Sequence, residues 1–120
     1  MREFRGVRQE NTGFRRMFTG SELELYVWYV EQGGDILGFQ LVYPISNGRK
    51  AFTWTAREGF SHLIIDGWDN NANAGSPFMV SDGTAINESI LSLLRTEIEN
   101  VEEPIRFMVL EKVEEFQKRS

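Results

Sequence analysis

The stretch GFQLVYPISNGRKAFTWTA, residues 38–56, decides the fold. Its centre, Asn47-Gly48, is the strongest hairpin signal in the chain, because both residues accept the positive φ angles of a tight two-residue turn. Apolar and polar residues alternate on either side of it, as they do along strands that bury one face. Gly38–Ser46 and Arg49–Ala56 are therefore predicted to pair as an antiparallel hairpin.

Further turn dipeptides extend this hairpin into a meander. They are Gly20-Ser21, Gly33-Gly34 and Glu58-Gly59, each lying between two runs that alternate with period two. The strands that they add are Phe14–Thr19, Leu23–Gln32 and Phe60–Asp66, with Phe78–Val80 as a further short candidate. The sequence therefore predicts an antiparallel meander of five or six strands.

Two-residue turns fix which residues lie opposite one another, so each face of the sheet can be predicted by counting. One face then carries Trp28 opposite Phe39, together with a row formed by Tyr26, Leu41, Trp54 and Leu63. The second face combines apolar and polar side chains. It carries Leu25, Val27, Tyr29, Val42, Thr53 and Ile64 around a polar row of Gln40, Thr55 and His62.

Helical spacing of apolar residues begins after the sheet. Asp82 or Thr84 is predicted to cap a helix from Ala85 to Asn100, and Pro104 suits the first turn of a second helix. Both helices are amphipathic and need an apolar surface to cover. The predicted fold class is α+β, an antiparallel meander followed by two C-terminal helices that pack on one sheet face, the aromatic one.

Length and composition predict one globular domain over residues 1–120. The chain has 120 residues, of which 41% are hydrophobic, and it contains no cysteine. The missing cysteines exclude thiolate chemistry and favour a reducing compartment. Neither a signal peptide nor an apolar run long enough for a membrane helix is present, so we expect a cytoplasmic protein without a membrane partner.

Charge is distributed unevenly along the chain. The first 20 residues hold five arginines and two glutamates, although the whole chain has a formal charge of −5. Residues 1–12 are predicted to form a flexible basic arm. Because the remainder of the domain is acidic and would repel a polyanion, nucleic acid is an unlikely partner.

Several short stretches resemble a known group of proteins. They are LYVWY at 25–29, GFQL at 38–41, FTW at 52–54 and GFSH at 59–62, and the likeness continues through Asp82-Gly83 into the C-terminal helices. The chain resembles a family of short, uncharacterised bacterial proteins. That family has no known activity, so the resemblance implies no catalytic residues and no cofactor.

The polar row of Gln40, Thr55 and His62, flanked by Tyr29 and Arg16, is the candidate ligand site. Donors and acceptors that project side by side from a rigid sheet suit a small polar or anionic ligand. The alternative is a wet outer face without a ligand, which is common in antiparallel sheets.

Catalytic and metal sites have little support in the sequence. His62 is the only histidine, which rules out zinc sites built on several histidines and mechanisms that use two. Asp69–Asn73 has the opening spacing of a calcium loop, but Ala74 and Val80 replace the glycine and the closing glutamate. We therefore predict no catalytic residue, no metal and no cofactor.

Two functions from different classes follow. The first is a non-enzymatic binding or interaction module that self-associates as a homodimer through an apolar patch on the second face, formed by Leu25, Val27, Val42 and Ile64. The second is a small-molecule binder or small enzyme that uses the Gln40, Thr55 and His62 row. The identity of the ligand or protein partner stays open.

Overall fold

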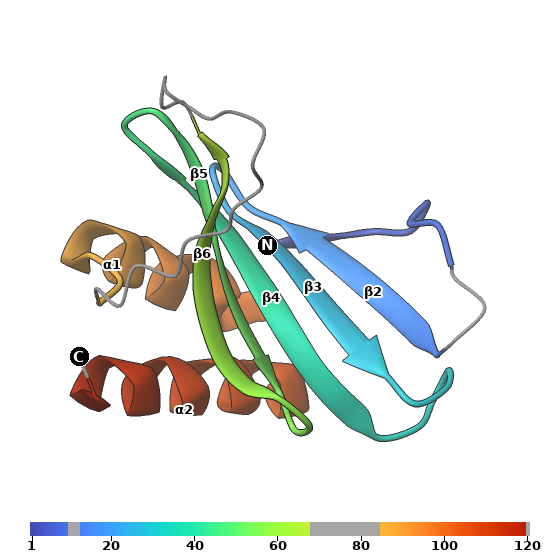
Figure 1. Cartoon of the computed structure of the whole chain (residues 1–120). Helices are drawn as coiled ribbons and strands as arrows, with labels where there is room; N and C mark the ends of the chain where they lie inside the picture. The colour runs from blue at the N-terminus through green and yellow to red at the C-terminus, as the bar shows by residue number, and fades with distance from the viewer. Residues whose placement is uncertain (10–12, 68–84, 120) are drawn as a thin grey trace.

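Six strands form one antiparallel sheet in chain order, and two helices follow, as seen in a computed structural model (Figure 1). The structure describes residues 1–9, 13–67 and 85–119. The strands are β1 (Arg2–Phe4), β2 (Phe14–Thr19), β3 (Glu24–Tyr29), β4 (Ile36–Ile45), β5 (Gly48–Thr55) and β6 (Gly59–Gly67). The helical elements are α1 (Glu88–Glu97), the single 3₁₀ turn η1 (Ile98–Asn100) and α2 (Glu103–Arg119). The predicted fold class is confirmed.

The N-terminal strand corrects one prediction. Arg2–Phe4 pairs with β2, with Glu3 opposite Phe18, so this part of the expected flexible arm belongs to the sheet. The strand that the sequence analysis did not predict is therefore β1, at the start of the chain. The candidate strand Phe78–Val80, the calcium-like loop Asp69–Asn73 and the proposed caps Asp82 and Thr84 lie outside the described residues.

A capping side chain marks the start of one helix, and a proline lies in the first turn of the other. Asn87 has an extended backbone and its side chain accepts a hydrogen bond from the Ile90 N–H at 3.2 Å, so it caps α1. The helix consequently begins at Glu88, three residues later than predicted. In α2, Pro104 lies in the first turn, where its missing N–H has no intrahelical acceptor. No helix in the described part of the chain is long and apolar enough to cross a membrane.

The core lies between the helices and one face of the sheet. In Figure 1 both helices lie on the same side of the sheet, while β2 and the end of β3 extend past them. The sheet side of the core is formed by Leu25, Val27, Tyr29, Phe39, Leu41, Tyr43 and Phe52. The helical side is formed by Ile90, Leu91, Leu94, Ile98, Ile105, Val109 and Val113.

The predicted faces are wrong in two hairpins, because their registers differ from the prediction by an odd number of residues. The β3–β4 turn contains four residues, since the Val30 N–H donates to Asp35 O at 2.9 Å. A bulge at Trp28/Tyr29 precedes the turn. Val27, and not Trp28, therefore lies opposite Phe39. Such a one-residue slip moves every side chain of β3 to the other face. Leu25 and Val27 thus face the helices, whereas Tyr26 and Trp28 face outward.

The β5–β6 turn also differs in length from the predicted turn, and this again exchanges the two faces of a strand. Thr55 pairs with Gly59, which has a φ of +79°, so the loop has three residues. This is the arrangement in which a glycine with positive φ ends a three-residue turn. His62 consequently lies opposite Phe52 on the core face, and Trp54 lies opposite Phe60. Trp54 and Leu63, predicted to be neighbours, face opposite sides of the sheet.

The β4–β5 hairpin keeps the predicted parity. Its loop is Ser46-Asn47 rather than Asn47-Gly48, because Ile45 pairs with Gly48. The pairing is displaced by two residues, so Phe39, Leu41, Phe52 and Trp54 still share one face, as predicted.

Candidate functional site

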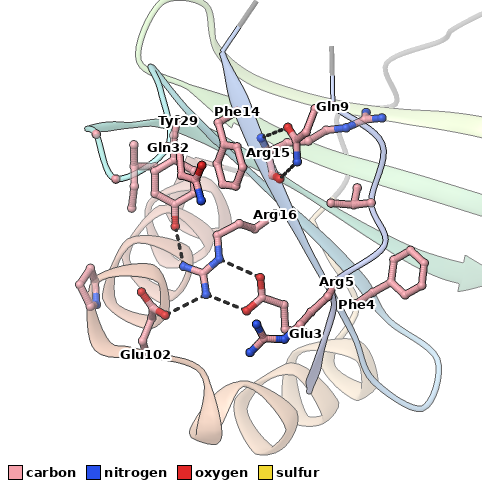
Figure 2. A pocket seen from close by; sticks show the side chains of 15 residues that line it. Glu3, Phe4, Arg5, Gln9, Phe14, Arg15, Arg16, Tyr29, Gln32 and Glu102 are labelled. Carbon is pink, nitrogen blue, oxygen red and sulfur yellow. Dashed lines mark hydrogen bonds and ion pairs between the residues drawn. The ribbon is translucent and has the colours of Figure 1, made fainter. Parts of the chain in front are cut away.

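An open groove of about 810 Å³ lies where β2 and β3 extend past the helices (Figure 2). Its walls come from β1, β2, the β3–β4 turn and the residues that begin α2. The side chains that matter most for its chemistry are Glu3, Phe14, Arg15, Arg16, Tyr29 and Glu102.

The pairing of β2 with β3 explains why polar groups line this groove. Phe14 lies opposite Tyr29, and Arg16 lies opposite Val27, which is fully buried. Arg16 thus occupies a position on the core face of the sheet. Because α2 begins nearby, the Arg16 guanidinium lies beside the N-terminal end of that helix and outside the apolar core.

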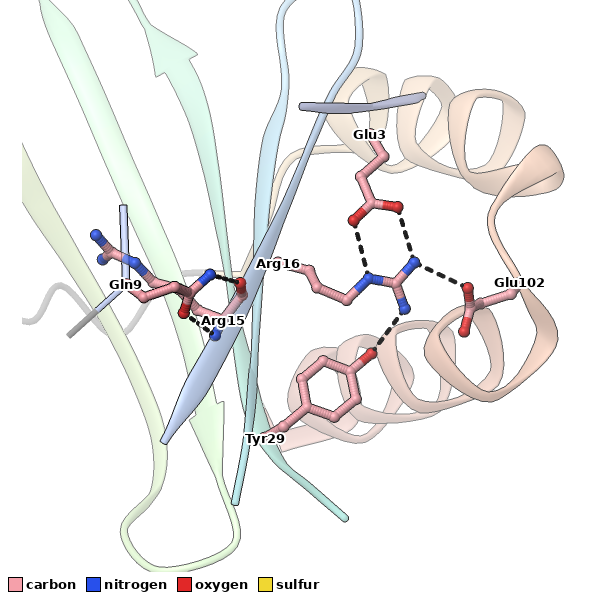
Figure 3. Close-up of polar contacts among 6 residues, drawn as sticks. All are labelled: Glu3, Gln9, Arg15, Arg16, Tyr29 and Glu102. Carbon is pink, nitrogen blue, oxygen red and sulfur yellow. Dashed lines mark hydrogen bonds and ion pairs between the residues drawn. The ribbon is translucent and has the colours of Figure 1, made fainter. Parts of the chain in front are cut away.

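Arg16 is the centre of the site (Figure 3). Its Nε and Nη2 donate to the two oxygens of Glu3 at 3.0 and 2.9 Å. Nη2 also donates to Glu102 Oε1 at 3.0 Å, and Nη1 donates to the Tyr29 hydroxyl at 3.1 Å. One guanidinium therefore joins β1, β2, β3 and the residue that precedes α2.

These contacts keep the central charges ionised. Hydrogen bonds to Glu3, and then to Glu102, raise the pKa of Arg16 above its ordinary value. The hydrogen bonds from Arg16 lower the pKa of Glu3, and partial burial opposes this effect only in part. The lining contains Arg5, Arg15 and Arg16 against Glu3 and Glu102. The Arg15 side chain lies on the outer face of β2, opposite Trp28, so the charges beside Arg16 are balanced.

An aromatic pair and a polar clasp complete the walls. The Phe14 and Tyr29 rings lie 6.1 Å apart with an interplanar angle of 57°. On the other side, Gln9 Nε2 donates to Arg15 O at 2.8 Å, and Arg15 N–H donates to Gln9 Oε1 at 2.9 Å. The clasp fixes the segment that follows β1 against β2, so the groove has a defined edge.

The structure separates the predicted ligand residues. Arg16 and Tyr29 are brought together by a hydrogen bond, but on the core face, so neither flanks Gln40 or Thr55. Gln40 lies opposite Thr53 on the outer face and donates to its hydroxyl at 3.0 Å, while Thr55 lies opposite Gly38 and Gly59. The predicted row is wrong for two reasons. The β4–β5 pairing is displaced by two residues, which separates Gln40 from Thr55, and the longer β5–β6 turn places His62 on the other face.

His62 belongs to the core. Its residue is 2% exposed, its Nε2 is hydrogen-bonded to the Tyr43 hydroxyl, and the Phe116 ring contacts it edge-on at a centroid distance of 5.4 Å. The imidazole therefore lies beneath α2 and points away from the outer face where Gln40 and Thr55 lie.

The predicted apolar patch is not a shared surface. Leu25 and Val27 have no exposed area because they lie in the core under the helices. Val42 is buried on the outer face of the sheet, where it pairs with Glu24. Ile64 pairs with Lys50 and lies on the core face. The four residues named for self-association do not form one contiguous face.

Sequence reasoning missed Glu3, Phe14 and Glu102. The signal that was present lies in FRRMF, residues 14–18, where Arg16 shares the parity of Phe14 and Phe18. An arginine on the apolar parity of a strand requires a buried or half-buried partner. Nothing local indicates Glu102, which lies 86 residues further along the chain.

Comparisons of the chain with models of known families, with curated proteins and with solved structures find no match. The resemblance to a family of short bacterial proteins therefore stays a prediction.

Proposed function

We propose that this chain is a non-enzymatic binding module for a small molecule, and that the groove around Arg16 is its site. The observation that carries the proposal is a half-buried guanidinium whose orientation is fixed by Glu3 inside an open groove of about 810 Å³. Pockets of this size with a few oriented polar groups beside aromatic walls are typical of small-molecule sites.

The same groove favours binding over acid–base catalysis. A general acid or base works best when its pKa lies near the working pH. Arg16 keeps its proton because its pKa is raised, and Glu3 stays ionised because its pKa is lowered. His62 lies in the core instead of the groove.

A ligand screen tests the proposal. The protein labelled with ¹⁵N is titrated with small carboxylates, phosphates, amines and sugars, and amide shifts are followed. We expect at least one class to move the amides of Phe14, Arg16 and Tyr29, and Arg16→Gln to abolish that response. Arg57→Gln, which removes an exposed charge in the β5–β6 turn, is the matched control and should leave it intact.

Two results would overturn the proposal. One is a screen in which no class moves the groove amides. The other is a response of equal size in Arg16→Gln and in the native chain.

Self-association, a cytoplasmic location and the absence of a nucleic-acid partner remain proposals from the sequence. The lack of cysteine supports a reducing compartment. A homodimer would have to use residues other than Leu25 and Val27, which are buried. Size-exclusion chromatography with light scattering distinguishes the two states, and a strict monomer at high concentration excludes the dimer.

A further inference from the structure

The two edges of the Arg16 guanidinium are held in different ways. Along the inner edge, Nε and Nη2 bind both oxygens of Glu3, whose side chain is 25% exposed. This paired geometry is the strongest that an arginine forms with a carboxylate. It fixes the plane of the guanidinium and directs the outer edge, Nη1 and Nη2, toward Tyr29 and Glu102, which line the groove (Figure 3).

The outer edge has weaker partners. Nη2 contacts one oxygen of Glu102, whose side chain is 51% exposed, and Nη1 donates to the Tyr29 hydroxyl. Within the described part of the chain, the Glu102 carboxylate makes no other hydrogen bond, although the Glu102 carbonyl accepts from the Arg106 N–H at 3.1 Å. A single exposed ion pair contributes little to stability, so Glu102 can leave Arg16 at small cost.

The positions of these two partners match those of a carboxylate. An arginine can bind a carboxylate along Nη1 and Nη2, with one oxygen near each nitrogen. Glu102 already places one carboxylate oxygen at Nη2. The Tyr29 oxygen accepts from Nη1, and its own hydroxyl hydrogen can point to a second acceptor.

We propose that the ligand is a small aromatic carboxylate, whose carboxylate replaces Glu102 on the outer edge of Arg16. This inference rests on the proposed function of the groove. Tyr29 donates its hydroxyl hydrogen to the bound carboxylate, and the aromatic body of the ligand lies against the Phe14 ring. Glu102 is then an internal competitor that occupies the site when no ligand is bound.

Charge and shape both favour this class. Exchange of one carboxylate for another leaves the balance around Arg16 unchanged, and Arg5 in the lining adds a positive charge that attracts the incoming anion. The Phe14 and Tyr29 rings, 6.1 Å apart and tilted by 57°, offer an aromatic wall against which the ring of the ligand can pack. A cationic ligand would meet the positive charges of Arg5 and Arg16 instead.

The test measures the affinity for benzoate and phenylacetate by NMR titration in four proteins: the native chain, Glu102→Gln, Glu103→Gln and Arg16→Gln. We expect Glu102→Gln to bind about two- to fivefold more tightly, because the competitor has lost its charge. Glu103 is exposed, neighbours Glu102 and is not part of the lining, so Glu103→Gln should leave the affinity unchanged. Arg16→Gln should lose binding.

Two further measurements separate the ligand classes. Benzamide has nearly the same shape as benzoate without its charge, and inorganic phosphate has charge without a ring. Both should bind at least tenfold more weakly than benzoate. Tyr29→Phe should weaken benzoate binding severalfold, since the second donor is lost while the ring remains.

The outcomes distinguish this inference from the proposed function. If benzamide, phosphate or an amine binds the groove through Arg16 and benzoate does not, the carboxylate inference fails and the proposed function stands. Weaker benzoate binding in Glu102→Gln shows that Glu102 assists binding and overturns the competitor role. If no compound moves the groove amides, both ideas fail.

Discussion

The carboxylate of Glu3 makes stability depend on acid pH. Its ordinary pKa is 4.5, and hydrogen bonds from Arg16 lower it in the folded protein. A lowered carboxylate pKa stabilises the fold above the unfolded value, and this contribution is lost as the pH falls through the lowered value. Glu3→Gln should therefore reduce the free energy of unfolding by about 1–3 kcal/mol at pH 7. Well below pH 4.5 the native chain and the variant should approach each other.

Urea unfolding at pH 7 and at pH 3 measures this difference directly. Glu22→Gln is the control, because Glu22 is exposed in the turn between β2 and β3. A difference between the native chain and Glu3→Gln that is as large at pH 3 as at pH 7 would show that the side chain acts through packing and not through its charge.

The Tyr43–His62 pair predicts a second effect at the scale of single residues. The Tyr43 hydroxyl is hydrogen-bonded to His62 Nε2 inside the core. Tyr43→Phe keeps the ring and removes that partner, so the buried imidazole is less well satisfied. We expect a loss of about 1–3 kcal/mol in the free energy of unfolding. Tyr26→Phe, the same change on the outer face, should cost much less, and equal losses would argue against the pair.

At the scale of the elements, Gly38 sets how closely β4 approaches β5. A Cβ atom at this position would lie 2.3 Å from Trp54 O and 2.7 Å from Thr55 Cα, and both are backbone atoms of the adjacent strand. Gly38→Ala should therefore destabilise the sheet by about 3 kcal/mol, as overpacking does where neighbours cannot move.

Gly33→Ala is the matched control for Gly38→Ala. Gly33 has a φ of +80° with nothing near its missing side chain, so alanine meets backbone strain alone and should cost about 1–2 kcal/mol. Thermal unfolding of both variants gives the comparison. A smaller loss for Gly38→Ala than for Gly33→Ala would mean that the two strands separate more easily than their geometry indicates.

The turns also explain how much of the fold could be predicted from the sequence. Alternation and glycine dipeptides located five strands correctly, because these signals are local. They could not give the loop lengths or the bulge at Trp28/Tyr29, which depend on how the strands pack. Each single-residue error exchanges the two faces of a strand. His62 was therefore predicted on the second face, in the polar row, and Leu25 in the patch for self-association.

The candidate site was predictable only in part, for the same kind of reason. Arg16 and Tyr29 were named only as neighbours of the predicted polar row, and the pairing of β2 with β3 places them together. Glu3 and Glu102 could not be predicted, since β1 is three residues long and Glu102 lies in a junction without periodicity. Long-range ion pairs leave no pattern in a single sequence.

At the scale of the whole molecule, β1 connects the sheet to the helical layer. Glu3 pairs opposite Phe18 on the core face and binds Arg16, and Asn100 Nδ2, in η1, donates to Met1 O at 2.8 Å. The same strand forms one wall of the groove (Figure 2). The short N-terminal strand therefore contributes both to stability and to the candidate site.

Deletion of residues 1–4 tests this role. The loss in free energy of unfolding should exceed that of Glu3→Gln, because the deletion also removes the pairing with β2 and uncovers the Phe18 side of the core. The exposed edge of β2 should in addition promote association of the shortened chain, since an unpaired edge offers its backbone groups to another strand. Urea unfolding and light scattering measure the two effects. If the shortened chain is as stable as Glu3→Gln and associates no more than the native chain, β1 contributes nothing beyond its glutamate.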